Sequence, residues 1–126
     1  ADGYFLPVTV LADISNDSEI ARKEVFGPVL VVTPFDTEEE AIALANATDF
    51  GLGAYVHTQN LRRAHHVTSQ LDAGMIHVNG SGEAMQPNCP FGGFKQSGHG
   101  RLGGVEGLQE FLQPKNIWMN LAAPEA

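Results

Sequence analysis

Residues 28–79 read PVLVVTPFDTEEEAIALANATDFGLGAYVHTQNLRRAHHVTSQLDAGMIHVN, and this stretch determines the predicted fold. It begins with PVLVVTPF, residues 28–35, a nearly continuous apolar run that is typical of a strand covered on both faces in a parallel sheet. Two further short strands are predicted at 53–58 and 75–79. Strands that alternate with helices indicate a parallel β-α-β-α-β core, because the connections are long enough for right-handed crossovers.

Two helices are predicted between these strands. Thr37 and Glu40 form a capping-box pattern, and the glutamates of the first turn complement the helix dipole. This first helix should end before Gly51. Asn60 can cap a second helix, in which apolar residues recur at intervals of three or four, and Gly74 supplies its stop.

The segments on either side carry weaker signals. Pro7 removes a ladder donor and favours an edge or irregular strand near the start. Residues 80–104 follow no period and are predicted to form a long glycine-rich loop that needs a partner surface. A short C-terminal helix is expected at 105–112, and NIWMNL, residues 116–121, is expected to form a terminal strand. The predicted fold class is α/β, with a parallel β-α-β-α-β core, the long glycine-rich loop, the short C-terminal helix and the terminal strand.

Composition narrows the choice of partners. The 126 residues, 43% of them apolar, suggest a single domain with a modest core. Seven basic against fifteen acidic residues give a formal net charge of −8, which disfavours nucleic acid as a partner. No stretch approaches the roughly 18 apolar residues of a membrane span, so we expect no membrane association. The single cysteine, Cys89, suits a reducing cytoplasm.

Several residues invite a chemical role that their sequence neighbours do not support. The five histidines are His57, His65, His66, His77 and His99. No two of them stand in an H-x-x-x-H arrangement, so no metal site is expected. Cys89 precedes Pro90 with no nearby base, and we interpret it as an inert loop cysteine rather than a nucleophile. Three asparagines that match N-x-[ST] are interpreted as structural: Asn16, Asn46 and Asn79.

Gly98, Gly100 and Gly103 stand at the G-x-G-x-x-G spacing of a dinucleotide-binding turn. That turn also requires a buried strand before the first glycine, a helix that opens at the third, and an acidic residue about 20 positions further on. CPFGGFKQ, residues 89–96, is polar and interrupted by glycine, so this context is not expected here. We therefore interpret the three glycines as shaping the backbone and not as binding a pyrophosphate.

Four segments resemble motifs of the aldehyde dehydrogenase superfamily. KEVFGPV, residues 23–29, resembles E-[IV]-F-G-P, and ANATDFGLGA, residues 45–54, resembles N-x-x-x-[YF]-G-L-[SG]-A. AGMIHVN, residues 73–79, is similar to A-G-x-x-x-[VI]-N, and PFGGFKQSGHGR, residues 90–101, is similar to the glycine-rich segment of the same enzymes. The segments follow in the family's order and cover nearly the whole chain. Leu102 departs from the pattern, because many relatives have a glutamate after G-R.

The resemblance implies that the chain is the C-terminal portion of an NAD(P)-dependent aldehyde dehydrogenase, which oxidises an aldehyde to a carboxylic acid. Residues 1–113 would belong to the catalytic domain, and residues 114–126 would form the terminal oligomerisation strand and tail. No catalytic residue is expected in this fragment, because the nucleophilic cysteine and the general-base glutamate of the family lie N-terminal to Ala1. NAD or NADP is the implied cofactor. The implied partners are a small-molecule aldehyde and further copies of the same chain, joined through the C-terminal strand, in the cytoplasm.

Three residues match binding positions of the family. Glu24 matches the glutamate that holds the nicotinamide ribose hydroxyls, and Phe26 matches the aromatic residue near the nicotinamide. A carboxylate accepts two hydroxyl protons at once, which orients the ribose and hence the carbon that takes the hydride. Phe91 matches a position near the aldehyde tunnel. The alternative hypothesis is a free-standing, non-catalytic binding or assembly module with the same fold.

Overall fold

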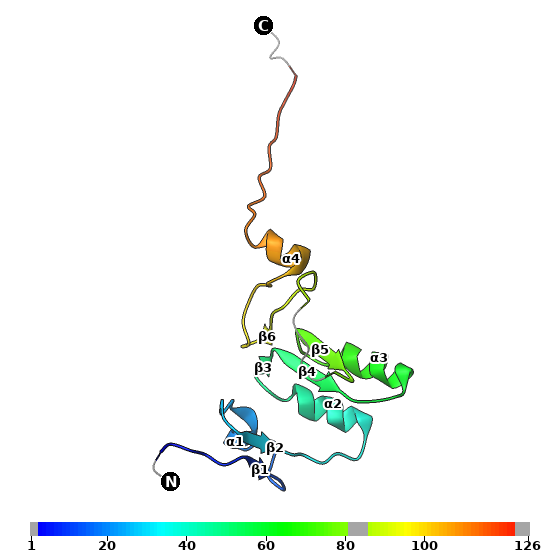
Figure 1. Ribbon diagram of the computed structural model, residues 1–126. Helices are drawn as coiled ribbons and strands as arrows, with labels where there is room; N and C mark the ends of the chain where they lie inside the picture. The colour runs from blue at the N-terminus through cyan, green and yellow to red at the C-terminus, as the bar shows by residue number, and fades with distance from the viewer. Residues whose placement is uncertain (1–2, 81–85, 123–126) are drawn as a thin grey trace.

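The computed structural model describes residues 3–80 and 86–122. In chain order the elements are β1 (Thr9–Leu11), α1 (Glu19–Arg22), β2 (Val29–Val31), α2 (Glu38–Asn46), β3 (Phe50–Gly51), β4 (Gly53–Val56), α3 (Leu61–Gln70), β5 (Met75–Val78), β6 (Phe94–Lys95) and α4 (Gly104–Gln109). Figure 1 shows β1, β2 and α1 at one end, β4 and β5 with helices α2 and α3 in the middle, and α4 beyond them. After α4 the chain runs away from the body as an extended segment.

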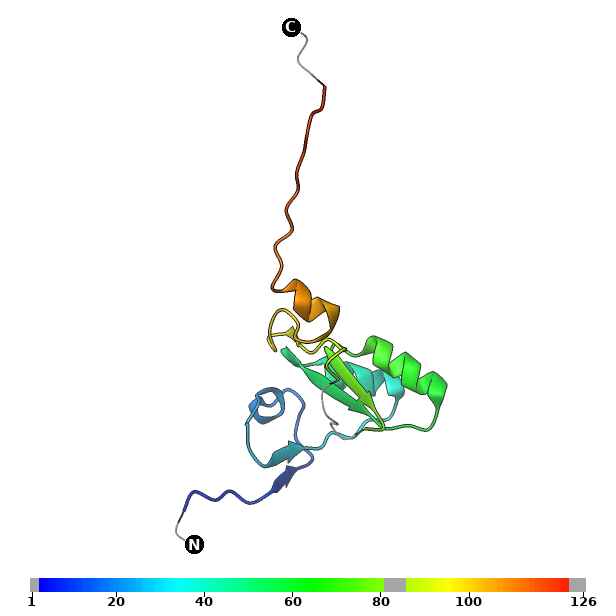
Figure 2. The ribbon, with the colours of Figure 1, turned by 45° about the horizontal axis from the view of Figure 1, so that its top comes forward.

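The strands form three two-stranded sheets in the described part of the chain. β1 and β2 pair in parallel, with Thr9 opposite Val29. β4 and β5 also pair in parallel, with Gly53 opposite Met75, while β3 and β6 pair antiparallel. Figure 2 separates the β1–β2 pair from the β4–β5 pair. The predicted mixed α/β class with parallel strands is therefore confirmed.

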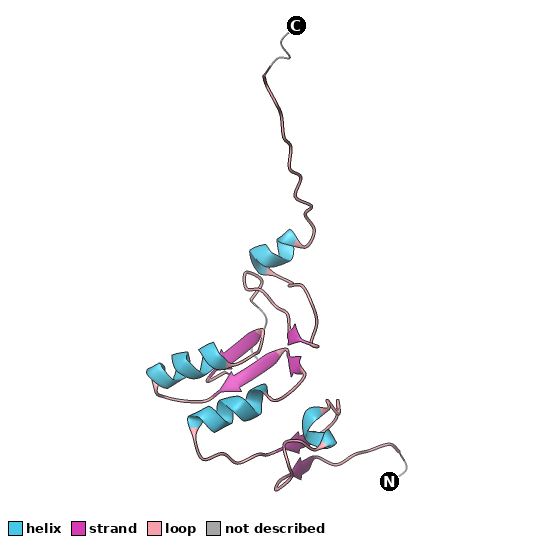
Figure 3. Ribbon diagram, turned by 180° about the vertical axis from the view of Figure 1, so that it is seen from behind, coloured by secondary structure: helices cyan, strands magenta, loops and turns pink. Residues whose placement is uncertain are grey.

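The helices α2 and α3 begin where the capping residues predict. Thr37 Oγ1 accepts a hydrogen bond from the Glu40 amide at 3.1 Å, and Glu40 Oε2 accepts one from the Asp36 amide at 2.8 Å. Asn60 Oδ1 accepts a hydrogen bond from the Arg63 amide at 3.1 Å and so caps α3. These bonds satisfy amide groups that have no partner within the helix. Figure 3 shows the two helices side by side next to the β4–β5 pair.

The first predicted strand differs from the prediction in length and in partner. β2 covers three of the eight residues of the run 28–35, and it pairs with β1 rather than continuing the β4–β5 sheet. Leu30 is 60% exposed, so this strand is not covered on both faces within the described chain. An apolar run signals a strand, but the identity of its neighbour is decided by contacts that are distant in sequence. Pro7 does precede an edge strand, as predicted.

The glycine-rich segment contains more regular structure than its composition indicates. β6 lies within it, and Phe91 forms an isolated antiparallel bridge with Leu102. A helix does open directly after Gly103, contrary to the prediction, because α4 begins at Gly104. The strand before the first glycine is nevertheless β6, which has two exposed residues and pairs antiparallel. Gly98, Gly100 and Gly103 have φ of 119°, 76° and 69°, which agrees with a role in shaping the backbone.

The expected modest core is not found among the described residues. Ala64 is the one apolar residue there that is buried, at 7% exposure, and every element except α2 and β3 carries an exposed large apolar side chain. The segment after α4 forms no strand in the described chain, and Trp118 within it is 90% exposed. An edge strand requires a partner backbone, and Figures 1 and 3 show none beside this segment. None of the helices built by the described residues is long and apolar enough to cross a membrane.

Candidate functional site

Glu24 and Phe26 line one open hollow of about 650 Å³. They lie on the turn that follows α1 and leads into β2. The opposite wall comes from the end of α2, from β3 and from the start of β4, and it includes Asn46 and Thr48. The segment after α3, with Asp72, also lines it, as do Met75 and Ser97. All four sequence segments that resemble family motifs therefore contribute residues to the same hollow.

Phe26 has an uncommon backbone conformation, with φ of 52°. A bulky residue with positive φ is an outlier, and such residues concentrate at binding sites where the surrounding structure holds them. The side chain is 91% exposed, so its own packing within this chain does not explain the conformation. The turn thus presents an aromatic ring to the hollow beside a carboxylate, and both groups are accessible to a ligand.

The wall opposite Glu24 depends on two glycines that have no room for a side chain. A Cβ added to Gly51 would lie 3.0 Å from the Cβ of Phe94, and still closer to the Asp72 carbonyl oxygen. A Cβ added to Gly74 would lie 2.8 Å from the carbonyl carbon of Gly92. The Gly74 amide donates to the Gly51 carbonyl oxygen at 3.0 Å. This close approach of three backbone segments explains why glycine stands at both positions.

Two of the three asparagines interpreted as structural make paired amide contacts. Asn79 accepts a hydrogen bond from the Thr58 amide at 2.9 Å and donates one to the Thr58 carbonyl at 2.8 Å. Asn46 donates to the Gln70 carbonyl at 2.7 Å and accepts from the Asp72 amide at 2.9 Å. Each side chain therefore acts as a bridge between chain segments, as the sequence interpretation predicts.

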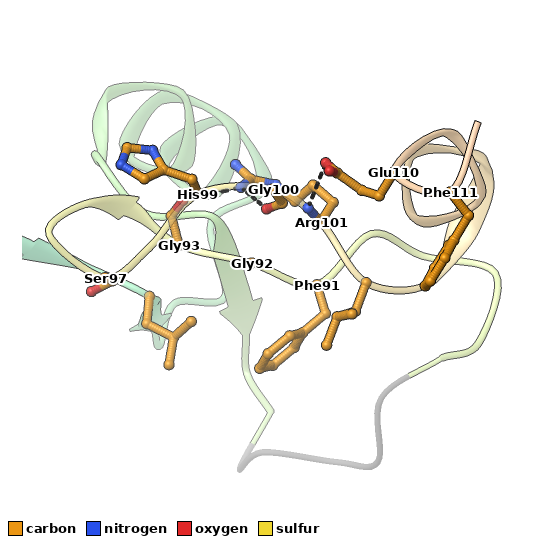
Figure 4. A pocket seen from close by; sticks show the side chains of 11 residues that line it. Phe91, Gly92, Gly93, Ser97, His99, Gly100, Arg101, Glu110 and Phe111 are labelled. Carbon is orange, nitrogen blue, oxygen red and sulfur yellow. Dashed lines mark hydrogen bonds between the residues drawn. The ribbon is translucent and has the colours of Figure 1, made fainter. Parts of the chain in front are cut away.

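Phe91 lines a second hollow, of about 360 Å³, which Figure 4 shows from close by. It is separate from the hollow that Glu24 and Phe26 share, although Leu52 and Ser97 line both. The structure thus brings two of the three predicted site residues together and places the third in an adjoining depression.

Arg101 and Glu110 hold the backbone around the second hollow by hydrogen bonds. The sequence analysis did not identify either as a site residue. Arg101 Nη1 donates to the carbonyl oxygens of Gly93 at 3.0 Å and Gly100 at 2.7 Å. The guanidinium lies 5.6 Å from the centre of the Phe94 ring. Glu110 Oε1 accepts a hydrogen bond from the Arg101 amide at 3.3 Å (Figure 4). An arginine inside a glycine-rich stretch is the sequence signal for such contacts, because one guanidinium group can donate to several backbone carbonyls at once.

The remaining candidates do not assemble into a site in the part of the chain that the structure describes. No group of three or more histidine, cysteine or carboxylate side chains comes together there. Cys89 is a free, exposed thiol. His77 stacks on Tyr55 across the β4–β5 pair, with ring centres 5.1 Å apart, which is a cross-strand packing contact.

The sequence profile of the Aldehyde dehydrogenase family matches residues 1–117. This chain belongs to the aldehyde dehydrogenase family. Among its curated relatives is betaine aldehyde dehydrogenase of Cereibacter sphaeroides, 46% identical over 124 residues. That match covers 98% of this aldehyde dehydrogenase chain and 26% of the relative. The NADP/NAD-dependent aldehyde dehydrogenase PuuC of Escherichia coli is 44% identical over 115 residues, which are 91% of this chain and 23% of that protein.

Solved structures agree with this assignment. The aldehyde dehydrogenase of Mycobacterium tuberculosis complexed with NAD+ superposes with a TM-score of 0.85 at 40% identity, covering 98% of this chain and 25% of that one. The NAD+ complex of aldehyde dehydrogenase from Bacillus cereus gives a TM-score of 0.87 at 42% identity, covering 96% of this chain and 24% of that one. The chain spans about a quarter of the length of the relatives that it matches.

Proposed function

We propose that this chain is the C-terminal portion of an NAD(P)-dependent aldehyde dehydrogenase that oxidises a small-molecule aldehyde to a carboxylic acid. In this proposal residues 1–113 complete the catalytic domain and residues 114–126 form the oligomerisation strand and tail. The chain contributes contacts to the nicotinamide ribose, a wall of the substrate tunnel and contacts between subunits. The observation that carries the proposal is the hollow in which residues of all four family-like segments meet around Glu24 and Phe26.

The residues of this hollow fit a nicotinamide nucleotide. The Glu24 carboxylate is accessible and offers two acceptor oxygens to a diol, while the accessible Phe26 ring offers an apolar face beside it. When bound, the cofactor accepts the hydride of the reaction. Glu24 would hold the ribose hydroxyls and Phe26 would limit the tilt of the neighbouring ring. Their contribution is positioning, since a well-oriented reactant loses less entropy on the way to the transition state.

Phe91 is proposed to face the aldehyde from the adjoining hollow. Its neighbourhood supports this role, because Leu52 and Phe111 supply further apolar lining and Arg101 ties the loop that carries it. The two hollows share Leu52 and Ser97, which is the arrangement expected when substrate and cofactor meet at one reacting carbon. In this proposal the nucleophile and the general base come from residues outside this chain.

The enzyme is proposed to be a homo-oligomer joined through residues 116–121. This segment extends away from the body in all views of the ribbon, and Trp118 and Leu121 within it are 90% and 89% exposed (Figures 1–3). An apolar, unpaired segment of this kind is a template for strand addition. A second copy of the chain is the proposed partner. We propose the cytoplasm as the compartment, because its reducing conditions keep a free thiol such as that of Cys89 reduced.

The test uses the longer enzyme that contains this chain, with Glu24→Gln as the variant. Loss of one charge-assisted contact to the ribose costs about 1.5–3 kcal/mol, so hydride transfer in single-turnover kinetics should slow by about 10- to 150-fold. Alkylation of the catalytic thiol should proceed at the unchanged rate, because Glu24 does not touch it in this proposal. Glu39→Gln is the matched control, since Glu39 is an exposed glutamate in the first turn of α2.

An unchanged hydride step in Glu24→Gln would remove Glu24 from the cofactor role. If the longer enzyme forms no NADH or NADPH with any aldehyde tested, the alternative of a non-catalytic module is favoured instead. Equal effects of the Glu24 and Glu39 substitutions would indicate a general loss of charge rather than a specific contact.

A further inference from the structure

Lys95 supplies a positive charge to the end of a helix that lies far from it in sequence. Its Nζ donates to the carbonyl oxygens of Asn46 at 2.9 Å and Thr48 at 3.2 Å. The same ammonium lies 3.3 Å from Oδ2 of Asp72. Helix α2 ends at Asn46 and has no basic residue in its last turn. A cation at these carbonyls satisfies acceptors without helical partners and complements the helix dipole, so Lys95 replaces the missing local cap.

The backbone at Lys95 is held in a conformation that side chains rarely adopt. Its φ is 52°, in the left-handed region that favours glycine. β6 ends at this residue, which stands opposite Phe50 in the antiparallel pair with β3. The Lys95 side chain is 28% exposed, far less than that of a free surface lysine. A non-glycine residue persists in such a conformation when surrounding contacts determine it, and the three oxygens around the ammonium are contacts of that kind.

The three residues that Lys95 contacts are themselves part of the wall of the hollow. Asn46, Thr48 and Asp72 all line the space that Glu24 and Phe26 share. Asn46 further joins α2 to the end of α3 through the Gln70 carbonyl. Lys95 does not line the hollow, so any effect that it has on a bound ligand passes through this wall.

We propose that Lys95 is a positioning residue for the cofactor hollow. Its ammonium holds the end of α2 and the segment after α3 together, and this fixes the wall that faces Glu24. Without the ammonium, two carbonyl oxygens and a carboxylate would lie close together with no donor between them, and the wall would relax away from its position. The inference rests on the proposed nicotinamide site, because it states what keeps that site in shape.

The experiment uses the longer enzyme with Lys95→Met, Lys95→Arg and, as a matched control, Arg62→Met. Arg62 is an exposed cation on α3 whose side chain makes no hydrogen bond to the described residues. NADH dissociation constants come from fluorescence titration, hydride transfer from stopped-flow absorbance, and thiol accessibility from the alkylation rate. Lys95→Met should weaken NADH binding about tenfold, because part of the free energy lost with these charged hydrogen bonds must then be supplied by NADH binding to reorder the wall. Lys95→Arg should restore most of the affinity, whereas Arg62→Met and the alkylation rate should not change.

An unchanged NADH dissociation constant in Lys95→Met would overturn the inference. The inference would also be overturned if Lys95→Met lowered the NADH affinity, the alkylation rate and the melting temperature together and Lys95→Arg restored none of them. That pattern indicates a merely structural role. If Lys95→Met does not fold, Asp72→Asn is used instead, because it removes the charge partner of Lys95. Asp72→Asn should weaken NADH binding about twofold to threefold, and an unchanged NADH dissociation constant in this variant also overturns the inference. Glu24→Gln is measured alongside. Normal hydride transfer in Glu24→Gln refutes the proposed cofactor site. Slow hydride transfer in Glu24→Gln together with an unchanged NADH dissociation constant in the Lys95 variants refutes this inference alone.

Discussion

Gly74→Ala is the substitution whose consequence follows most directly from the geometry. The new Cβ would lie 2.8 Å from the Gly92 carbonyl carbon, and closer still to its oxygen. Carbon atoms in contact normally stand about 3.5–4.0 Å apart, so the Gly92 segment must retreat by about 0.7 Å or more. The obstructing atoms are backbone, which cannot rotate away as the end of a long side chain does. Overpacking of this type costs about 1–3 kcal/mol and occasionally more, and we expect about 3 kcal/mol here.

Gly53→Ala is the matched control, because it adds the same methyl group to the strand that pairs with β5. Its nearest neighbour would be the Met75 carbonyl oxygen at 3.9 Å, an ordinary contact. Both substitutions remove conformational freedom from the unfolded chain, which is worth about 0.4–1 kcal/mol in favour of the folded state. Gly53→Ala should therefore be neutral or slightly stabilising, and the two variants should differ in sign.

The assay is urea unfolding of the proposed longer enzyme, followed by steady-state kinetics with aldehyde and cofactor. We expect a lower unfolding midpoint for Gly74→Ala and a raised KM for the aldehyde, since Gly92 follows Phe91 directly in the second hollow. Equal midpoints for the Gly74 and Gly53 variants would show that the backbones are not in the contact described. A lower midpoint with an unchanged aldehyde KM would refute the link between this contact and the Phe91 hollow.

Further substitutions test the local contacts and the assembly. Asn79→Ala removes both hydrogen bonds to Thr58 and should lower the free energy of unfolding by about 1–2 kcal/mol in urea titration, more than a surface substitution. Thr37→Ala removes the cap of α2 and should cost about 1 kcal/mol, whereas Thr37→Ser should cost little in the same titration. Truncation after Gln113 should weaken assembly, and a clean monomer in light scattering of the intact chain at about 100 μM would contradict the role of the tail. The 126-residue chain alone should form no NAD(P)H from aldehydes; turnover that Cys89→Ser abolishes would make that thiol the nucleophile.

The features that local sequence determines were predictable. Thr37 and Asn60 cap their helices as predicted, because a cap involves only the next three residues. The parallel pairing of the strands predicted at 53–58 and 75–79 is also present, as β4 and β5. The resemblance to family motifs supplied Glu24 and Phe26, and the structure brings these two residues into one hollow.

The features that depend on distant contacts were not predictable from periodicity. The partner of β2 is β1, which an apolar run around Leu30 does not specify. β3 and β6 have two residues each, too few to show any alternation, and they exist because Gly51 allows Phe94 to approach. The positive φ of Phe26 and the reach of Lys95 to the end of α2 leave no local signature at all.

The distance along the chain between Asn46 and Lys95 has a consequence for biosynthesis. The two residues are 49 positions apart, so at about 5–20 residues per second the ribosome adds Lys95 about 2–10 s after Asn46. The cap of α2 at Thr37 is complete almost at once, because Glu40 follows within three residues. The N-terminal cap of α2 therefore forms seconds before the Lys95 ammonium reaches the carbonyl groups at its C-terminal end. During that interval the carbonyls of Asn46 and Thr48 are open to water or to a chaperone, and the wall that contains them acquires its final contacts only after Lys95 has been added.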